Sequence, residues 1–515
     1  TSYAAPQVAG AIAILNEAFP NHTPAMIVDR LLATGQNSTS LIGAHTGAVT
    51  FGNDVQHGYN ANMGHGLMDV YAALNPITSS SYTQSNNQLG EELGSGGGEG
   101  NGQSFGLITK VLDENGQTTQ HDMRTSYVAT SQSLGDSLQN NLSGVQNYLY
   151  DALDGGFKYK LSAHVIDKVT KKPIATFETD FNLLNKNVIQ IEDKKFELIE
   201  ENLGVAFSTI NENESDGFNV TLFEPSTAVQ NFVKDENDQF LGFNNQDAYY
   251  LNTEDNGYSI GYRYQASKHV AYSYSYEAPM QVEDDDYAGK NSMFAVTSEY
   301  FGDNYKHTLI SGLMKEEGSF LDTEAKGIFE MDNLETEHNF FGIKSEFTIG
   351  NSMYLKGSYS SATSTLHYTY SPLIDYASEL ISDNFEIVIA KDFNDLGLKT
   401  VLSISQPNRI RSGMMQFNEP SLSTLHGDIY YDKKDVSLSP SGRQIDIGLG
   451  FAKTFNEDSK VITKFTLQDE YNHNKNNDTE YGLSIVGKHK KFKLGYMHNS
   501  YDSNNQFKLS YETKF

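Results

Sequence analysis

Apolar and polar residues alternate with a period of two from about residue 256 to the C-terminus, and this pattern limits the fold more than any other feature. The last segment is the clearest, since Phe507, Leu509 and Tyr511 alternate with Lys508 and Ser510. Such alternation gives a β-strand one apolar and one polar face. Thirteen strands of this kind fit between residues 258 and 515.

The connections between these strands alternate between short and long. The short ones carry turn residues and lie at 302–304, 350–351, 393–395 and 456–458. The long ones are polar and span 278–291, 316–338, 362–383 and 406–443. Tight turns at one end of a sheet and large loops at the other are typical of outer-membrane β-barrels. The pattern therefore predicts an antiparallel transmembrane β-barrel whose Tyr and Phe side chains face lipid and its interfaces.

The number of strands is constrained by where such a barrel begins and ends. A barrel whose first and last strands both reach the periplasmic side needs an even number, so thirteen is wrong by at least one. An additional strand is expected upstream, within 217–223 or 240–251, and we predict 12–14 strands with 14 preferred. The alternative is a soluble β-sandwich or up-and-down barrel that buries its apolar face in a core.

Composition excludes several classes of protein. The 515 residues include 37 Lys and Arg against 66 Asp and Glu, a net charge of −29, and no Cys. This balance argues against nucleic acid as a partner, because nucleic acid binds to cationic surfaces. The lack of Cys excludes disulfides, thiolate zinc sites and thiol nucleophiles. No apolar run approaches the roughly 18 residues of a transmembrane helix. The strands of a membrane β-barrel need no such run, because only every second residue of each strand is apolar.

The first ten residues, Thr-Ser-Tyr-Ala-Ala-Pro-Gln-Val-Ala-Gly, carry a specific pattern. They resemble the nucleophile segment of subtilisin-like serine proteases, G-T-S-x-A-A-P-x-V-A-G, from its second position onward. The resemblance implies that Ser2 is the catalytic nucleophile and that its backbone N–H is an oxyanion donor. Tyr3 and Gln7 replace the commoner Met and His, and neither carries the chemistry. The alternative is an ordinary capped, Ala-rich helix start.

A second segment extends this resemblance. Residues 64–73, Gly-His-Gly-Leu-Met-Asp-Val-Tyr-Ala-Ala, look like the Gly-x-Gly and short helix that close a subtilase domain. In that family the triad Asp and His precede the Ser, so both are expected upstream of Thr1, and this chain alone should have negligible activity. The histidines that follow the motif are interpreted as surface or structural residues: His22, His45, His57 and His65.

The part of the chain between the motif and the barrel is mixed. Residues 77–104 are rich in Gly, Ser and Asn and predict a flexible linker. Within 105–224, apolar residues spaced by three or four predict a helix over 134–153, and strands are expected at 157–165 and 176–181. Residues 133–138 resemble the stalk between passenger and barrel in autotransporters, and the alternative is an extra small domain.

Together these features are similar to the subtilisin-type autotransporters of Gram-negative bacteria. The segments 405–407 and 436–446 also resemble the barrel region of such proteases. The resemblance implies a multidomain chain: an N-terminal fragment of an α/β subtilisin-like domain (1–76), the linker (77–104), a stalk region (105–224) and the barrel (225–515). It further implies protein or peptide substrates, a protease displayed at the cell surface, and outer-membrane lipid and the barrel-assembly machinery as partners. A porin-like or adhesin barrel with a degenerate protease remnant is the alternative.

Other candidate sites are weaker. The acidic run Glu283, Asp284, Asp285 and Asp286 could bind a structural Ca²⁺, although a solvated acidic loop is the simpler interpretation. No other cofactor is expected. Charged residues at polar strand positions should face the lumen, where they contact a plugging helix or line water: Arg263, Lys344, Glu346, Lys356, Lys399, Asp446, Lys464, Lys508, Glu512 and Lys514.

Overall fold

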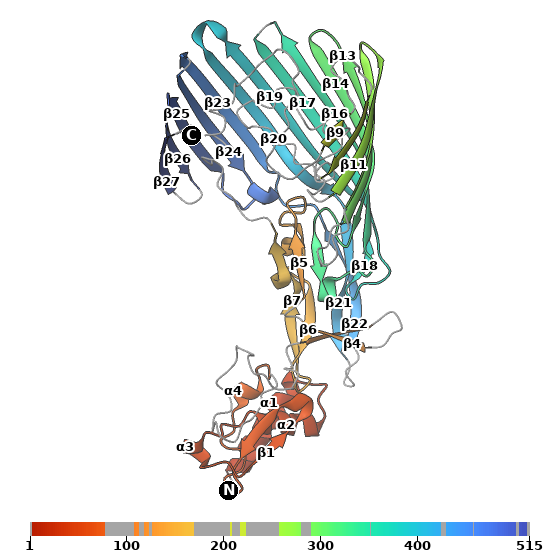
Figure 1. Cartoon of the computed structure of the whole chain (residues 1–515). Coiled ribbons are helices and arrows are strands. Elements are labelled where there is room, and N and C mark those ends of the chain that lie inside the picture. Colours follow the sequence, from red (N-terminus) through yellow and green to blue (C-terminus); the bar gives the residue numbers. More distant parts are fainter. Residues whose placement is uncertain are drawn as a thin grey trace.

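Three parts follow one another along the long axis of the molecule: a small N-terminal unit, a middle region and a broad curved sheet (Figure 1). The computed structural model describes residues 3–77, 108–112, 118–122, 126–168, 206–208, 217–222, 257–279, 290–350, 352–423, 429–456, 458–500 and 504–511. The predicted linker after Ile77, and the strands predicted at 176–181 and 240–251, lie outside the described residues. No helix in the described part of the chain is long and apolar enough to cross a membrane.

The N-terminal unit (residues 3–77) is built from four helices and one hairpin. Its elements are α1 (Ala4–Ala18), α2 (Pro24–Ala33), α3 (Thr39–Ile42), α4 (Val70–Ala73), β1 (Gly47–Thr50) and β2 (Gln56–Tyr59). The short helix expected within residues 64–73 is confirmed as α4. Thr23 caps α2 by accepting a hydrogen bond from the N–H of Met26 at 3.3 Å, and Pro24 occupies the first turn. The small core contains Leu15, Phe19 and Ile27.

The N-terminal unit does not contain the sheet of an α/β domain among its described residues. Its β1 and β2 pair only with each other, antiparallel, from Gly47 opposite Tyr59 to Thr50 opposite Gln56. Helix α1 buries only Ala11 and Leu15. Residues 3–77 thus form a small helical unit with one hairpin.

A single antiparallel sheet of fifteen strands dominates the described chain. Thirteen are the long strands β11 (Gly257–Ser267), β12 (Val270–Pro279), β13 (Lys290–Phe301), β14 (Tyr305–Glu317), β16 (Glu335–Ile349), β17 (Met353–His367), β19 (Leu380–Phe393), β20 (Leu398–Ser412), β23 (Ile445–Asn456), β24 (Ser459–Asp469), β25 (Glu480–His489), β26 (Phe492–Asn499) and β27 (Asn504–Tyr511). The sheet curves into the wall of a β-barrel (Figure 1). The number of strands predicted after residue 257 is therefore confirmed.

Two further strands precede the long ones. Strand β10 (Gly217–Leu222) pairs with β11, and β9 (Ala206–Ser208) pairs with β10. The upstream strand predicted at 217–223 is confirmed and brings the number to the preferred fourteen. Strand β9 was not predicted, and with it the described sheet exceeds the range of 12–14 by one strand. This strand has only three residues, which is too few to show alternation in the sequence.

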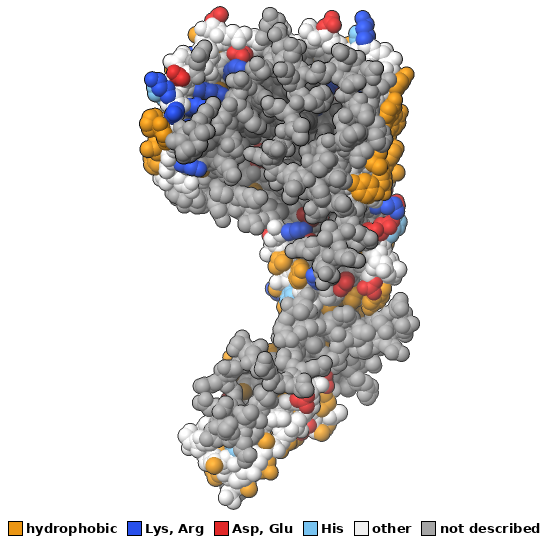
Figure 2. Space-filling model, viewed as in Figure 1, with side chains coloured by type: hydrophobic (Ala, Val, Ile, Leu, Met, Phe, Trp, Pro, Cys, Tyr) orange, Lys and Arg blue, Asp and Glu red, His pale blue; other side chains and the backbone are white. Residues whose placement is uncertain are grey.

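This sheet covers its polar face and exposes its apolar face, which is the reverse of a sheet in a water-soluble protein. On β16 the charged and polar side chains are covered, with Lys344 fully buried and Glu346 6% exposed, whereas Phe341 and Ile343 are 55% and 43% exposed. Large apolar side chains are exposed along the outside of most other long strands, and they line the right-hand edge of the sheet in Figure 2. A soluble barrel would bury the apolar face instead, so that alternative is excluded. An apolar outer surface of this extent suits lipid.

The short and long connections lie at opposite ends of the sheet, called here the turn end and the loop end. All four predicted short turns are confirmed, although Asn351 and Glu457 fall outside the described residues. The prediction that the long connections are simple polar loops is wrong. They contain β15 (Glu324–Lys326), β18 (Ile374–Ala377), β21 (Met414–Ser423) and β22 (Ile429–Ser437). Short 3-10 turns complete the connections at Gly327–Phe329, Asn394–Leu396 and Tyr471–His473.

The middle region (residues 108–168) consists of short strands. A four-stranded sheet contains β3 (Ile108–Leu112), β4 (Thr118–Asp122), β6 (Gln146–Tyr150) and β7 (Gly156–Lys160), and a three-stranded sheet joins β5 (Tyr127–Thr130) and β8 (Val165–Asp167) to β15. The helix predicted over 134–153 is wrong beyond α5 (Ser137–Asn141). Gly144 follows that helix and disfavours its continuation. Leu142, Val145 and Leu149 still share one core, which they reach through a turn and a strand.

One hydrophobic core joins the middle region to the long connections of the barrel. From the middle region it takes Leu134, Leu138 and Leu161, and from the connections Phe329 and Phe417, among other buried residues. We call this cluster the shared core. The middle region, predicted as a stalk or as a small domain, thus shares its hydrophobic core with the long connections of the barrel.

Candidate functional site

The segment that resembles a subtilase nucleophile leads into helix α1. Thr1 and Ser2 lie outside the described residues, so the predicted nucleophile stays a prediction. Tyr3 is the residue that precedes the helix, and it is 88% exposed. Pro6 lies in the first turn, where the backbone N–H groups have no partner within the helix. Helix α1 begins at Ala4.

Several large apolar side chains of the N-terminal unit are exposed. Val8 and Ile14 on the helix are 41% and 50% exposed, and Met63, Leu67 and Tyr71 are 60%, 59% and 79% exposed. Exposed apolar patches of this kind mark surfaces that another structure covers.

The second subtilase-like segment forms a tight turn followed by a short helix. Gly66 has a φ of +99°, and a Cβ there would lie 2.0 Å from the carbonyl oxygen of Gln36, so only glycine fits. Asp69 caps α4, accepting a hydrogen bond from the N–H of Ala72 at 2.9 Å and another from the side chain of Gln36 at 2.8 Å. These bonds hold the pKa of Asp69 below its ordinary value.

The histidines near the motif have structural contacts, as predicted. His45 Nε2 lies 2.8 Å from the carbonyl oxygen of Asn37, and His57 Nε2 lies 3.1 Å from that of His65. The rings of His57 and His65 stack with their centroids 5.2 Å apart. Burial lowers the pKa of both side chains, and of His22. These neutral rings act as packing groups of the N-terminal unit.

A buried arginine fixes the N-terminal unit to the middle region. Arg30 is fully buried, and its Nη2 lies 2.7 Å from Oδ2 of Asp151, which is also fully buried. The same guanidinium donates to the carbonyl oxygens of Ala73 at 2.6 Å and Asn75 at 2.9 Å. Its carbon lies 4.0 Å from the centre of the Phe19 ring. One side chain therefore ties together α2, the end of α4 and the middle region.

Asp151 is held equally firmly on its own side. Its carboxylate accepts hydrogen bonds from the backbone N–H groups of Ile77 at 2.9 Å, Leu153 at 3.0 Å and Gly155 at 2.7 Å. A Cβ at Gly155 would lie 2.5 Å from Nη1 of Arg30. Arg30 and Asp151 therefore form a tightly packed joint between the N-terminal unit and the middle region. The sequence did not predict this joint, because its residues are far apart in the chain and belong to no recognisable motif.

The predicted lumen residues lie on the covered face of the sheet wherever the structure describes them. Ion pairs join Lys356 to Glu386 at 2.7 Å and Arg263 to Glu299 at 3.0 Å. Lys344 lies 3.7 Å from Glu346 and Lys399 lies 3.3 Å from Asp392, whereas Asp446 accepts hydrogen bonds from the side chains of Gln444 and Gln468. The strand register places Lys464 and Lys508 on the same face. Glu512 and Lys514 are outside the described residues.

A buried polar network that was not predicted lies at the loop end of this face. His338 Nε2 is 3.0 Å from Oε2 of Glu316, and His338 Nδ1 is 2.7 Å from the hydroxyl of Ser364. Glu316 also accepts hydrogen bonds from the backbone N–H groups of Leu321 at 2.7 Å and Asp322 at 3.0 Å. The network fixes the turn that carries β15 toward the middle region. Only the strand register reveals that these residues meet.

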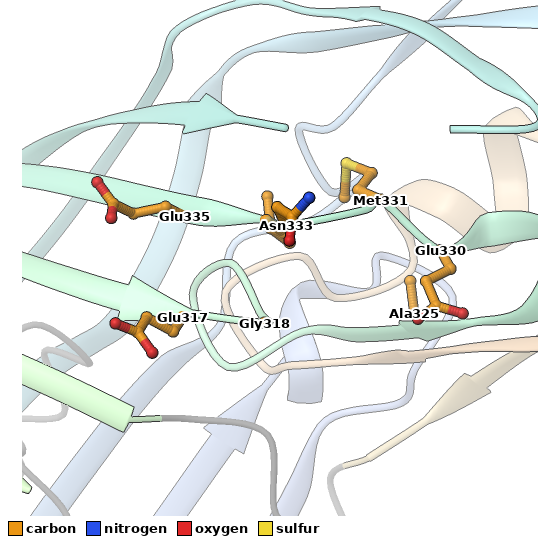
Figure 3. A pocket seen from close by; sticks show the side chains of 8 residues that line it. Glu317, Gly318, Ala325, Glu330, Met331, Asn333 and Glu335 are labelled. Carbon is orange, nitrogen blue, oxygen red and sulfur yellow. The ribbon is translucent and has the colours of Figure 1, made fainter. Parts of the chain in front are cut away.

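A pocket of about 420 Å³ opens beside this turn (Figure 3). Glu317 and Glu335 line it from opposite positions on β14 and β16, and Glu330 lines its far side. Lys315 lies 2.7 Å from Glu335 and offsets part of this charge. The described residues that line the pocket include neither Ser nor His.

No metal site is found in the described part of the chain, where no three His, Asp or Glu side chains gather suitably. The predicted Ca²⁺ run at 283–286 lies outside the described residues.

Comparison with known proteins gives only distant structural likenesses. No family model and no curated protein matches the chain. The chain is similar to the outer-membrane expressed OmpT of Vibrio cholerae, with 12% identity over 53% of this chain and 78% of that chain and a TM-score of 0.32. It is also similar to a Pseudomonas aeruginosa FadL homologue, with 10% identity over 47% of this chain and 69% of that chain and a TM-score of 0.24. A third similar structure is the ferric yersiniabactin uptake receptor FyuA of Yersinia pestis, with 10% identity over 57% of this chain and 52% of that chain and a TM-score of 0.27. Likeness at this level carries no information about function.

Proposed function

We propose that this chain is the C-terminal part of a surface-displayed, outer-membrane-anchored serine endopeptidase of the subtilisin type. In this proposal the barrel translocates and anchors the peptidase passenger. The observation that carries the anchoring role is the reversed polarity of the sheet, with Phe341 and Ile343 exposed outside and Lys344 and Glu346 covered inside. A surface of this kind is stable only where lipid replaces water.

The path of the chain supports a translocating role. Lys168, at the end of the middle region, forms ion pairs with Asp322 and Glu324 at the loop end of the sheet. The next described strand, β9, runs antiparallel to β10 in the sheet, and β10 begins at Gly217 opposite Arg263, close to the turn end. Lys168 thus lies at the loop end of the sheet and Gly217 lies close to its turn end, so the chain leads from one end to the other. That path is expected if everything before it has passed from the turn side to the loop side.

The peptidase role rests on the resemblance of residues 1–10 and 64–73 to a subtilase. Ser2 would attack a peptide carbonyl, an upstream His would accept its proton, and water would hydrolyse the acyl-enzyme. The N–H of Ser2 would stabilise the oxyanion at the start of α1. The exposed apolar side chains of Val8, Ile14 and Leu67 support this role, because the remainder of a peptidase domain would cover them.

The test uses the full-length gene product in outer-membrane preparations. Ser2→Ala should abolish peptide hydrolysis and labelling by a fluorophosphonate, whereas Ser38→Ala, an exposed serine of the same unit, should leave both intact. Activity and labelling that survive in Ser2→Ala would refute the peptidase role.

A porin-like or adhesin barrel with a degenerate protease remnant is the second candidate. It is favoured by the described residues of the N-terminal unit, which contain only the β1–β2 hairpin as a sheet. The gene upstream of Thr1 discriminates between the two. Asp and His triad segments there support the peptidase, and the lack of both supports the second candidate.

A further inference from the structure

Two lysines project from the outer, apolar face of the sheet near its turn end. On β19, Lys391 follows Ile387 and Ile389 at alternate positions. On β23, Lys453 follows Phe451 in the same way. Alternate residues of a strand share one face, so both lysines lie on the face that carries the exposed apolar side chains. A charged side chain on a lipid-facing surface is unfavourable unless it lies near the membrane interface.

An aromatic side chain from the end of the strand lies next to each lysine. Nζ of Lys391 lies 5.0 Å from the centre of the Phe393 ring, and Nζ of Lys453 lies 5.7 Å from that of Phe455. The two phenylalanines are 37% and 63% exposed. Each belongs to a position two residues, or about 7 Å, closer to the turns than its lysine. Long cationic side chains reach toward polar surroundings in this way while their stems cover apolar surface.

Exposed aromatic side chains lie near the turn end of other strands as well: Tyr300 on β13, Tyr305 on β14, Phe347 on β16 and Phe492 on β26. In membrane barrels such side chains gather at the boundary between headgroups and hydrocarbon. Figure 2 shows charged side chains along the upper rim of the sheet, which is the turn end, and hydrophobic side chains below them at both edges. The two lysines therefore lie among the side chains that mark the level of lipid headgroups.

The strand register brings the two lysines into one patch. Lys391 lies opposite Thr400 on β20, and Lys453 lies opposite Leu398 on the same strand. The lysines are therefore two strands, or about 10 Å, apart across the sheet. Leu402, which is 38% exposed, continues the outer face of β20 toward the middle of the sheet. Cationic groups and rings near the rim, with apolar surface beneath them, match the headgroup and the acyl chains of a phospholipid.

Both ammonium groups have donors to offer. Asp392, the residue after Lys391, lies on the covered face of the sheet, where it forms an ion pair with Lys399 at 3.3 Å. Lys453 donates a hydrogen bond to the carbonyl oxygen of Leu396, and an ammonium group has three N–H donors. The patch therefore complements a negatively charged headgroup.

We propose that Lys391, Phe393, Lys453 and Phe455, called here the turn-end patch, bind the headgroup of an anionic phospholipid. The phosphate oxygens accept charge-assisted hydrogen bonds from the ammonium groups, and the acyl chains lie on the apolar face of β20 and its neighbours. This inference rests on the proposed anchoring of the barrel in lipid, and it does not depend on the peptidase role.

The test measures the thermal unfolding of the full-length chain in mixed micelles by its heat-modifiable gel migration. Phosphatidylglycerol should raise the unfolding temperature above its value with the same mole fraction of phosphatidylcholine. The variant K391Q/K453Q should lose this increment, and K391R/K453R should keep it, because arginine also binds phosphate. The control K326Q/K475Q removes the same charge from exposed positions in the long connections and should keep the increment as well.

A single variant covers the case in which the double variant does not fold. K391Q should raise the mole fraction of phosphatidylglycerol at half-effect about fivefold, the contribution of one lysine near a membrane surface. The inference is overturned if phosphatidylglycerol stabilises the natural protein no more than phosphatidylcholine does, or if the control loses as much of the increment as K391Q/K453Q. An equal increment from inorganic phosphate in lipid-free micelles would also overturn it, because the ligand would then be free phosphate.

Insertion into phosphatidylcholine vesicles tests the anchoring separately. The natural protein and all the variants should float with these vesicles and resist extraction by alkaline carbonate. Insertion without any increment from phosphatidylglycerol would overturn the turn-end patch alone. Failure of the natural protein to insert would refute the anchoring on which the patch rests.

Discussion

Arg30 on α2 and Asp151 in the middle region form an ion pair of 2.7 Å in which neither side chain is exposed. A buried charge is stable only when it is paired and hydrogen-bonded, and here both partners are. The pair therefore holds the N-terminal unit on the middle region, because the loss of either partner would leave the other as a buried, unpaired charge.

Asp151→Ala should destabilise the joint by about 3–5 kcal/mol, since it leaves the Arg30 guanidinium buried without its partner. Hydrogen exchange of the α2 and β7 amides should rise, as measured by mass spectrometry on the native protein. Glu17→Gln, on the exposed side of α1, should change stability by less than about 0.5 kcal/mol. The double variant Arg30→Met/Asp151→Leu should be less destabilised than Asp151→Ala. Equal exchange in Asp151→Ala and Glu17→Gln would contradict the role of the joint.

Ile343→Lys and Leu41→Lys form a matched pair, because the two side chains are 43% and 45% exposed. If Ile343 faces lipid, its replacement should cost about 2–4 kcal/mol near the middle of the bilayer. Leu41 faces water, so its replacement should be almost neutral. Urea unfolding of the protein in liposomes measures both. Similar small effects at the two positions would show that the outer face of β16 does not meet lipid.

Phe329→Ala should weaken the middle region although Phe329 belongs to a barrel connection. The side chain is fully buried in the shared core, and truncation of such a residue costs about 3–5 kcal/mol. Limited proteolysis should then cut within residues 126–168 faster than in the natural protein. Leu396→Ala, at a turn position that is 58% exposed, provides the control. Unchanged cutting of the middle region in Phe329→Ala would mean that the two halves fold independently.

The stability of the N-terminal unit should depend on pH through its buried histidines. Burial lowers the pKa of His22, His57 and His65 from the ordinary value of 6.5, so the folded state binds fewer protons than the unfolded state below that pH. Stability should be complete above pH 6.5 and should fall as pH drops toward the lowered pKa values. Hydrogen exchange of α1 and α2 between pH 5 and pH 8, corrected for the intrinsic rate, measures this.

His57→Gln should flatten that pH dependence, whereas His489→Gln, at an exposed position of the barrel, should leave it unchanged. A pH dependence that is the same in all three proteins would exclude His57 as a contributor.

Much of the barrel could be predicted because its signal is local. A period of two in the sequence gives the strands, and turn residues such as Gly302 and Gly350 give the connections at the turn end. Helices α1 and α2 were predictable for the same reason, from local apolar patterns and the Thr23 cap.

The remaining features depend on contacts between distant residues. Leu134, Leu138 and Leu142 have helical spacing, yet only the first part of that segment is helical, because loops from the barrel complete its core. The Lys356–Glu386 pair depends on strand register, which a sequence without pairing information does not fix. The candidate nucleophile could be named from its motif, but its chemistry depends on residues that the motif does not contain.

The shared core also sets an order of events in time. Ser131 contacts Thr323 across 192 positions of the chain, and Ser133 contacts Asn408 across 275. Contacts between such distant residues form slowly, because a large loop must close before they are made. The middle region is synthesised long before the connections that complete it, so we expect it to remain open until the barrel has assembled. Its half-built state would keep the segment extended during export, and completion of the barrel would act as the signal to fold.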